Sequence, residues 1–187
     1  MEAFLVSTGL VAIAEIGDKT MLLAILLAAR FRRPAPIILG ILVATLANHA
    51  LAAWVGQLAA SWLDGAWMRW ALGLAFLVFA AWALIPDKLD ENEAPPALKA
   101  GSIFLTTLVA FFLVEMGDKT QVATVALGAR FGDVALVAAG TTLGMMIANI
   151  PAVLLGEAAA TRLPLKYIRW AAAAGFAAVG LWVLVAG

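Results

Sequence analysis

Two long stretches of the sequence, residues 35–57 and 134–156, are apolar and carry no formal charge. A helix that crosses a bilayer needs about 20 mostly apolar residues, so each stretch is long enough to cross once. Four more stretches have a similar character and cover residues 3–29, 70–86, 101–129 and 170–187. Hydrophobic residues make up 65% of the chain and charged residues 13%, which leaves too few polar residues to cover a water-facing surface. We therefore predict an all-α integral membrane protein with six transmembrane helices.

The charge balance and the missing cysteines exclude several classes of protein. Twelve basic and twelve acidic residues give a net charge of zero, which is not the footprint of a nucleic-acid binder. With no Cys, disulfides, thiolate metal sites and cysteine nucleophiles are excluded. The chain begins Met1-Glu2, without the basic segment of a signal peptide, so the first apolar stretch is expected to stay in the membrane. The expected partners are the lipid bilayer and small solutes, and a homo-oligomer is compatible with the sequence.

Lys and Arg are distributed unevenly over the predicted loops. Alternate loops hold eight on one side, namely Arg30, Arg32, Arg33, Lys88, Lys99, Arg162, Lys166 and Arg169. The other side holds only Arg69 and Arg130. Because basic loops stay in the cytoplasm, we predict a multi-pass protein of the inner (plasma) membrane with both termini outside the cytoplasm. The acidic, proline-containing segment 88–99 is then a cytoplasmic linker between a first domain, 1–87, and a second, 100–187.

The two domains are copies of one another. When the sequence is compared with itself at a shift of 100 positions, 24 of 87 aligned pairs are identical, against roughly 8 expected by chance. Each copy contains three predicted helices, an odd number, so the second copy enters the membrane upside down. Two inverted three-helix repeats are an architecture of secondary transporters, which bind their substrate near the midplane, between the repeats.

A charged motif interrupts the first helix of each repeat. It reads Glu15-Ile16-Gly17-Asp18-Lys19-Thr20 in the first copy and Glu115-Met116-Gly117-Asp118-Lys119-Thr120 in the second. Ionisable residues inside a bilayer are costly and are functional candidates by default. Gly17 and Gly117 loosen the backbone, so a local break in each helix is expected.

Symmetry would bring the four acids Glu15, Asp18, Glu115 and Asp118 together. Their charge and that of Lys19 and Lys119 sum to −2, which balances one divalent cation. Carboxylate, amide and carbonyl oxygens suit Ca²⁺, Mn²⁺ or Mg²⁺. Further oxygen ligands are expected from Thr20, Thr120, Gln121, Asn48 and Asn149. Without the metal, close like charges in a low dielectric favour the protonated acids, so protons are expected to replace the departing cation.

Several residues keep two interpretations. Glu15 and Lys19 are four residues apart and could neutralise one another within one helix. Lys19 and Lys119 could instead extend towards the membrane surface. His49 is a candidate proton carrier, although a single histidine in an apolar helix is more often a packing residue.

The duplicated E-x-G-D-[KR]-[TS] motif resembles that of the GDT family of small cation/proton exchangers. Its members include Golgi proteins that supply manganese to the lumen and bacterial manganese exporters. The resemblance covers the whole chain and implies that the acids of both motifs bind the cation. It also implies roles for Gly17, Lys19, Thr20 and their counterparts Gly117, Lys119 and Thr120.

The sequence thus predicts a secondary transporter and not an enzyme. It would export a divalent cation, Mn²⁺ before Ca²⁺, in exchange for protons by alternating access, and no cofactor is expected beyond the transported ion. One alternative is an exporter of a small organic cation or an amino acid such as lysine. A less favoured one is an intramembrane aspartyl protease with Asp18 and Asp118 as its dyad, although the resembling proteases carry G-x-G-D and Y-D motifs.

Overall fold

The computed structural model describes residues 1–62, 66–86, 102–156 and 164–186. Within these ranges the chain forms eight α-helices and no strand. The first half contains α1 (Glu2–Glu15), α2 (Lys19–Phe31), α3 (Pro34–Trp62) and α4 (Ala66–Ala83). The second half contains α5 (Ile103–Glu115), α6 (Lys119–Phe131), α7 (Val134–Leu155) and α9 (Leu165–Ala186). The order of helices in one half is therefore repeated in the other. The predicted linker 88–99 lies outside the described residues.

The first predicted helix of each half is broken at the charged motif. α1 stops at Glu15 and α2 starts at Lys19, and the same interval separates α5 from α6. Gly17 and Gly117 have φ angles of +85° and +81°, a left-handed conformation that glycine adopts without the cost of a Cβ atom. Asp18 and Asp118 follow in an extended conformation as the N-caps of α2 and α6. The expected breaks in the two helices are thus confirmed.

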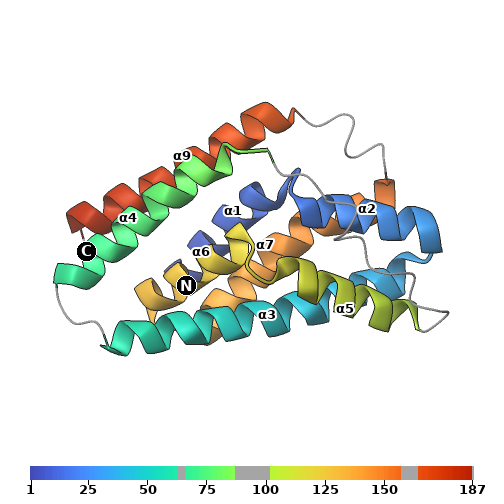
Figure 1. Cartoon of the computed structure of the whole chain (residues 1–187), viewed down its shortest axis with the longest axis horizontal. Coiled ribbons are helices and arrows are strands. Elements are labelled where there is room, and N and C mark those ends of the chain that lie inside the picture. Colours follow the sequence, from blue (N-terminus) through green and yellow to red (C-terminus); the bar gives the residue numbers. More distant parts are fainter. Residues whose placement is uncertain (63–65, 87–101, 157–163, 187) are drawn as a thin grey trace.

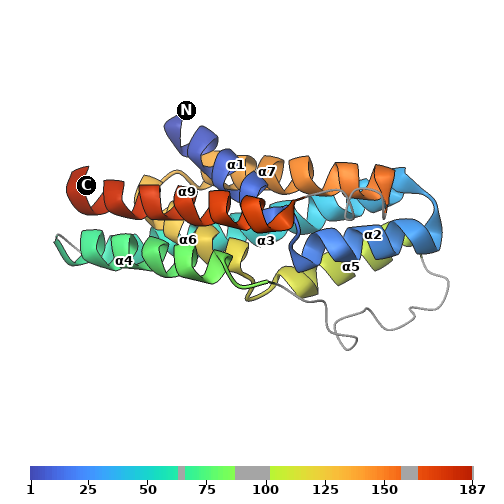
Figure 2. The ribbon, with the colours of Figure 1, turned by 90° about the horizontal axis from the view of Figure 1, so that it is seen from above.

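Short turns place the next helix of each half antiparallel to the broken one. The turn after α2 has Arg32 at φ +52°, and α3 begins with Pro34, a residue suited to the first turn of a helix. In the second half, Gly132 takes the left-handed position and the Asp133 side chain accepts a 3.0 Å hydrogen bond from the Leu136 amide. The N-terminus and the end of α9 lie in the same half of the molecule as the end of α3, the start of α4 and the α6–α7 connection. The α2–α3 turn and the start of α5 lie at the opposite end (Figures 1 and 2).

Each broken helix packs on the long helix of the other half. α1 and α2 contact α7, while α5 and α6 contact α3. Small residues allow this close approach: a Cβ atom on Gly56 of α3 would collide with the Val125 backbone, and one on Gly128 of α6 would collide with the backbone of Ala53. The two halves are therefore interleaved and share their interior.

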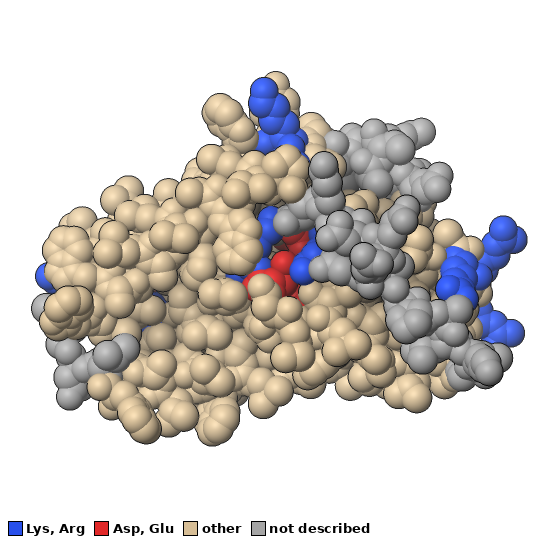
Figure 3. Space-filling view, in the orientation of Figure 1, with Lys and Arg blue, Asp and Glu red and all other residues tan. Residues whose placement is uncertain are grey.

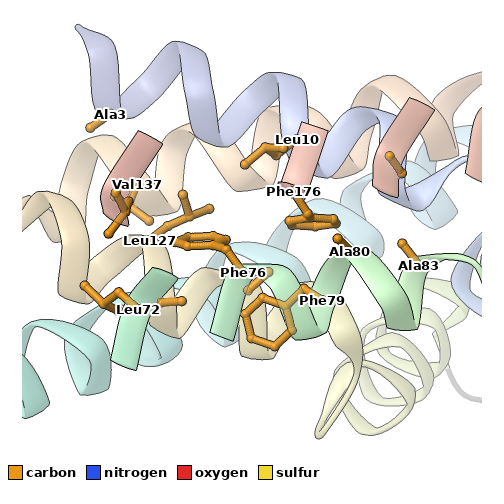
Figure 4. Packing of buried hydrophobic residues seen from close by; sticks show 14 of the residues in the cluster. Ala3, Leu10, Leu72, Phe76, Phe79, Ala80, Ala83, Leu127, Val137 and Phe176 are labelled. Carbon is orange, nitrogen blue, oxygen red and sulfur yellow. The ribbon is translucent and has the colours of Figure 1, made fainter. Parts of the chain in front are cut away.

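α4 and α9 pack against one another and lie over one end of this arrangement (Figures 1 and 2). Phe79 of α4 forms edge-to-face pairs with Phe76 and with Phe176 of α9, at centroid distances of 6.0 and 6.1 Å. These rings join a buried cluster that includes Leu10 of α1 and Leu127 of α6 (Figure 4). The cluster holds the α4–α9 pair against both broken helices.

The helix lengths and the surface agree with a membrane environment. In the described part of the chain, three helices are long and apolar enough to cross a bilayer, covering Pro34–Trp62, Val134–Leu155 and Leu165–Val185. Trp67–Ala83 and Ile103–Glu115 are apolar but shorter. Many large apolar side chains are exposed, among them Leu39, Trp54 and Leu154, as expected where lipid is the solvent. The prediction of an all-α membrane protein is confirmed at this level.

Candidate functional site

The four motif acids are buried at the helix breaks, near the middle of the molecule. Glu15 ends α1, Glu115 ends α5, and Asp18 and Asp118 cap α2 and α6. None of the four is more than 4% exposed. Figure 3 shows a small group of acidic and basic side chains near the centre of one face of the molecule. Burying charge is unfavourable unless it is paired or binds an ion, so their surroundings decide what this site can do.

Three of the acids form one compact group. Glu15, Glu115 and Asp118 each contribute an oxygen that lies within 4.8 Å of the other two. Ca²⁺ holds oxygen ligands at about 2.3–2.6 Å, so oxygens on opposite sides of one ion are about 4.6–5.2 Å apart. A single divalent cation can therefore contact all three carboxylates. The group draws on both halves of the chain.

The two lysines of the motifs pair across the halves. Lys19 Nζ lies 3.3 Å from Asp118 Oδ1, and Lys119 Nζ lies 3.3 Å from Asp18 Oδ1. The lysine side chains are 16% and 11% exposed, so they do not extend to the membrane surface as one interpretation suggested. Asp18, the fourth acid, is not in the three-carboxylate group, whereas Asp118, which makes the equivalent ion pair, is. These crosswise ion pairs connect the two motifs and balance part of the acidic charge.

Threonine hydroxyls orient the two glutamates in the same way. Thr20 Oγ1 donates to Glu15 Oε2 at 2.5 Å, and Thr120 Oγ1 donates to Glu115 Oε1 at 2.6 Å. Within the described residues, the other oxygens, Glu15 Oε1 and Glu115 Oε2, are buried without a hydrogen-bond partner. Buried carboxylate oxygens normally have partners. These two are thus well placed to accept a proton.

Helix ends add dipoles of both signs at the same place. The N-termini of α2 and α6 and the C-termini of α1 and α5 all lie at the motif. The positive N-terminal ends of α2 and α6 stabilise the ionised form of the nearby acids. The last carbonyl groups of α1 and α5 offer additional oxygen atoms as ligands for a cation. Discontinuous helices of this kind form the substrate and ion sites of many secondary transporters.

The remaining residues predicted for the site, three ligands and the possible proton carrier His49, do not follow the two-fold pattern. On α3, His49 is fully buried and its Nε2 lies 3.3 Å from Glu115 Oε1. Asn48 donates to the Phe112 carbonyl at 3.4 Å and accepts from the Gln121 amide. The Gln121 carbonyl accepts from the Gly117 amide at 2.6 Å. Asn48 and Gln121 thus support the second break, and their metal-binding role stays a prediction.

The first motif and α7 carry different partners. Met21 Sδ, not a glutamine, accepts from the Gly17 amide at 3.4 Å. Asn149, which aligns with His49, donates to the carbonyl and the Sδ atom of Met145 on its own helix, both at 3.0 Å. Its proposed role as a ligand remains untested. The site therefore has a symmetric acidic centre with asymmetric surroundings.

The sequence interpretation did not foresee that α4 and α9 form a wall of this site. A cavity of about 20 Å³ lies between the motifs and these helices, and its lining includes Asp18, Lys119, Ala83, Arg169 and Phe176. This volume is about that of one water molecule. Arg169, which the sequence places in a predicted loop, therefore lies beside the motifs.

A buried cluster of acids between broken helices, inside a shell of apolar helices, is typical of an ion transporter. The profile described as "Divalent cation/proton antiporter GDT1" matches residues 3–91 and 103–187 of the chain. The chain therefore belongs to the GDT1 family of divalent cation/proton antiporters. The resemblance to this family that the sequence indicated is confirmed, as is the expectation that the protein is a transporter and not an enzyme.

Three relatives show how far the similarity extends. A protein of Vibrio cholerae named "Putative manganese exporter" is 48% identical over 187 residues, which cover all of this chain and 89% of the relative. "GDT1-like protein sll0615" of Synechocystis is 29% identical over 90% of this chain and 89% of the relative. "Divalent cation/proton antiporter GDT1" of Saccharomyces cerevisiae is 26% identical over 90% of this chain and 78% of the relative. No solved structure matches the chain.

Proposed function

We propose that this protein exports Mn²⁺ from the cytoplasm in exchange for protons, with Ca²⁺ as the second candidate ion. The observation that carries the proposal is the group of buried oxygens from Glu15, Glu115 and Asp118, which lie within 4.8 Å of one another. Membership of the antiporter family supports cation and proton exchange, and the name of the Vibrio cholerae relative supports manganese.

Charge balance supports the exchange with protons. The four motif acids and the two paired lysines carry a net charge of −2, which one divalent cation neutralises. When the cation leaves, the acids remain close together and buried, and both conditions favour their protonated forms. Glu15 and Glu115 each keep a buried oxygen without a hydrogen-bond partner in the described chain, and these oxygens are the proposed sites for the protons. His49 is a further candidate proton carrier.

We further propose six membrane crossings in two inverted repeats. In this arrangement α1 with α2, and α5 with α6, each form one broken crossing, and α3, α4, α7 and α9 supply the other four. The connections α3–α4 and α6–α7 and both termini then lie outside the cytoplasm, as the distribution of Lys and Arg predicts. The site lies at the midplane, where alternating access would open it to one side and then to the other.

The orientation is tested by labelling, which the cysteine-free sequence makes simple. Arg33→Cys at the start of α3 is expected to resist a membrane-impermeant maleimide in intact cells and to react after the cells are opened. Asp133→Cys at the start of α7 is expected to react in intact cells. The reverse pattern would invert the proposed orientation.

The function is tested by reconstitution of the purified protein into liposomes with a pH gradient. We expect Mn²⁺ uptake coupled to proton movement in the opposite direction, and its loss in Asp118→Asn and in Asp18→Asn. Asp133→Asn, which changes an acid outside the motifs, is the matched control and should retain transport. Cation flux without opposing proton movement would refute the coupling, and normal flux in both motif variants would refute the site.

The same vesicles test the alternative of an organic cation exporter. Asp18 and Asp118 contact lysine ammonium groups of the chain itself, and a ligand ammonium would have to compete with these pairs. Movement of radiolabelled lysine with no flux of Mn²⁺ or Ca²⁺ would favour this alternative. Movement of the metal without lysine would exclude it.

A further inference from the structure

The single histidine of the chain faces the acidic group from α3. His49 is 0% exposed, and its one recorded polar contact joins Nε2 to Glu115 Oε1 at 3.3 Å. The other ring nitrogen, Nδ1, is buried and has no hydrogen-bond partner among the described residues. Burying a polar ring costs free energy unless its nitrogen atoms form hydrogen bonds or bind an ion. Among the described residues, the hydrogen bond of this ring is the one to Glu115 at the proposed cation site.

The spacing of His49 and Glu115 is that of two neighbouring ligands on one ion. Ligands at right angles around Ca²⁺ are about 3.3–3.7 Å apart, and around Mg²⁺ about 2.8–3.0 Å, as their bond lengths require. The Nε2–Oε1 distance of 3.3 Å, here that of a hydrogen bond, lies in the Ca²⁺ range and about 0.3 Å above the Mg²⁺ range, so a small shift of either side chain would suit an ion of intermediate size. His49 is not one of the residues whose ligand atoms all lie within 4.8 Å of one another, but a cation bound at Glu115 Oε1 would have the imidazole nitrogen as its neighbour on the α3 side.

This nitrogen has no equivalent in the other half. The position that aligns with His49 holds Asn149, whose amide bonds to Met145 on its own helix. The acids, threonines and lysines of the motifs all follow the internal repeat, but the imidazole does not. It adds a different ligand chemistry to a site otherwise built of oxygen atoms.

We propose that His49 Nε2 is a ligand of the transported cation and makes the site prefer Mn²⁺ over Ca²⁺. Ca²⁺ takes oxygen ligands almost exclusively. Mn²⁺ also favours oxygen and is the weakest nitrogen binder of the first-row divalent transition metals, but as one of them it accepts an imidazole nitrogen beside carboxylates. A site with one nitrogen and several carboxylates discriminates between ions that an all-oxygen site would treat more alike. This inference rests on the proposed function and names the origin of its selectivity.

Pulsed electron paramagnetic resonance of bound Mn²⁺ tests the ligation directly. We expect the spectrum of the wild-type protein, prepared without a histidine tag, to show ¹⁴N modulation of a coordinated imidazole. Because the chain contains one histidine, such a signal can come only from His49. Bound Mn²⁺ without nitrogen coupling would overturn the proposal, and this measurement needs no variant to fold.

Transport by His49→Asn tests the selectivity. This variant places the residue of the second half in the first, and we expect the ratio of Mn²⁺ to Ca²⁺ flux to fall at least about tenfold, since even outer-shell changes cost 10–100-fold in metal affinity. The control is Thr141→Val on α7, a buried hydroxyl bonded to its own helix, which should leave the ratio unchanged. An equal loss of both fluxes in His49→Asn would assign His49 a structural role and overturn the proposal.

The two proposals fail differently. Wild-type Mn²⁺ flux with an unchanged ratio in His49→Asn would remove only the role of His49. Absence of both Mn²⁺ and Ca²⁺ flux in the wild-type protein would remove the proposed function itself.

Discussion

The crosswise ion pairs should contribute measurably to the stability of the protein. Lys19–Asp118 and Lys119–Asp18 are both 3.3 Å long, and the two aspartates are no more than 4% exposed. At this distance and an effective dielectric constant of about 20, Coulomb attraction is about 5 kcal/mol. Removing one partner of a buried pair typically costs about 3–5 kcal/mol, because the other charge stays buried. We expect Lys19→Met to destabilise the protein by this amount.

Thermal unfolding in detergent, followed by tryptophan fluorescence, measures the effect. For a chain of this size, 1 kcal/mol corresponds to about 2–4 °C in Tm, so Lys19→Met should lower Tm by about 6–20 °C. Residues in direct contact couple by about 0.5–3 kcal/mol. The double variant Lys19→Met/Asp118→Asn should therefore be less destabilised than the sum of its parts. Lys119→Met with Asp18→Asn should show a coupling of the same size, since both pairs have the same length.

Asp133, an acid far from the ion pairs, serves as the control for this comparison of single and double variants. Asp133 caps α7 beyond the site, so Lys19→Met and Asp133→Asn should add within about 0.5 kcal/mol. Additive effects of Lys19→Met and Asp118→Asn would refute the crosswise pairing. So would a large coupling of one pair and none of the other.

Two further predictions concern the helix breaks. Gly117→Ala should lower the free energy of unfolding by about 1–2 kcal/mol through its left-handed backbone alone, since an added Cβ atom meets nothing nearby. Gly17→Ala should cost more, because its Cβ atom would overlap the Leu165 side chain. Equal shifts in Tm for the two variants would contradict this. Thr20→Val removes the hydroxyl that donates to Glu15 and should weaken Mn²⁺ binding about 10–100-fold. Titration of the purified protein with Mn²⁺ measures this change. Unchanged affinity would show that the hydroxyl does not orient the carboxylate.

Local features of the fold could be predicted from the sequence. The apolar stretches indicated the helices, and the glycines of the motifs indicated where two of them break, because the left-handed conformation at Gly17 and Gly117 is a property of single residues. The burial of the four acids followed from their depth in apolar segments. Each of these conclusions depends only on neighbours in the chain.

Features that depend on docking of the halves could not be predicted. Lys19 is four residues from Glu15 in the sequence, yet the structure places it 3.3 Å from Asp118, since α1 and α2 pack on α7 and α5 and α6 pack on α3. His49 and Asn48 are adjacent, and only the rotation of α3 decides that the imidazole faces Glu115 while the amide contacts Gln121. The wall formed by α4 and α9 also depends on docking, and the sequence contains no signal for it.

The interleaving of the halves has a consequence for biosynthesis. α2 ends at Phe31, but α7, on which α1 and α2 rest, is complete only at Leu155, 124 residues later. A ribosome that adds about 5–20 residues per second needs about 6–25 s for this interval. During that time the newly inserted Glu15 and Asp18 lack their final surroundings, so the nascent first half depends on lipid, water or the insertion machinery until the second half arrives.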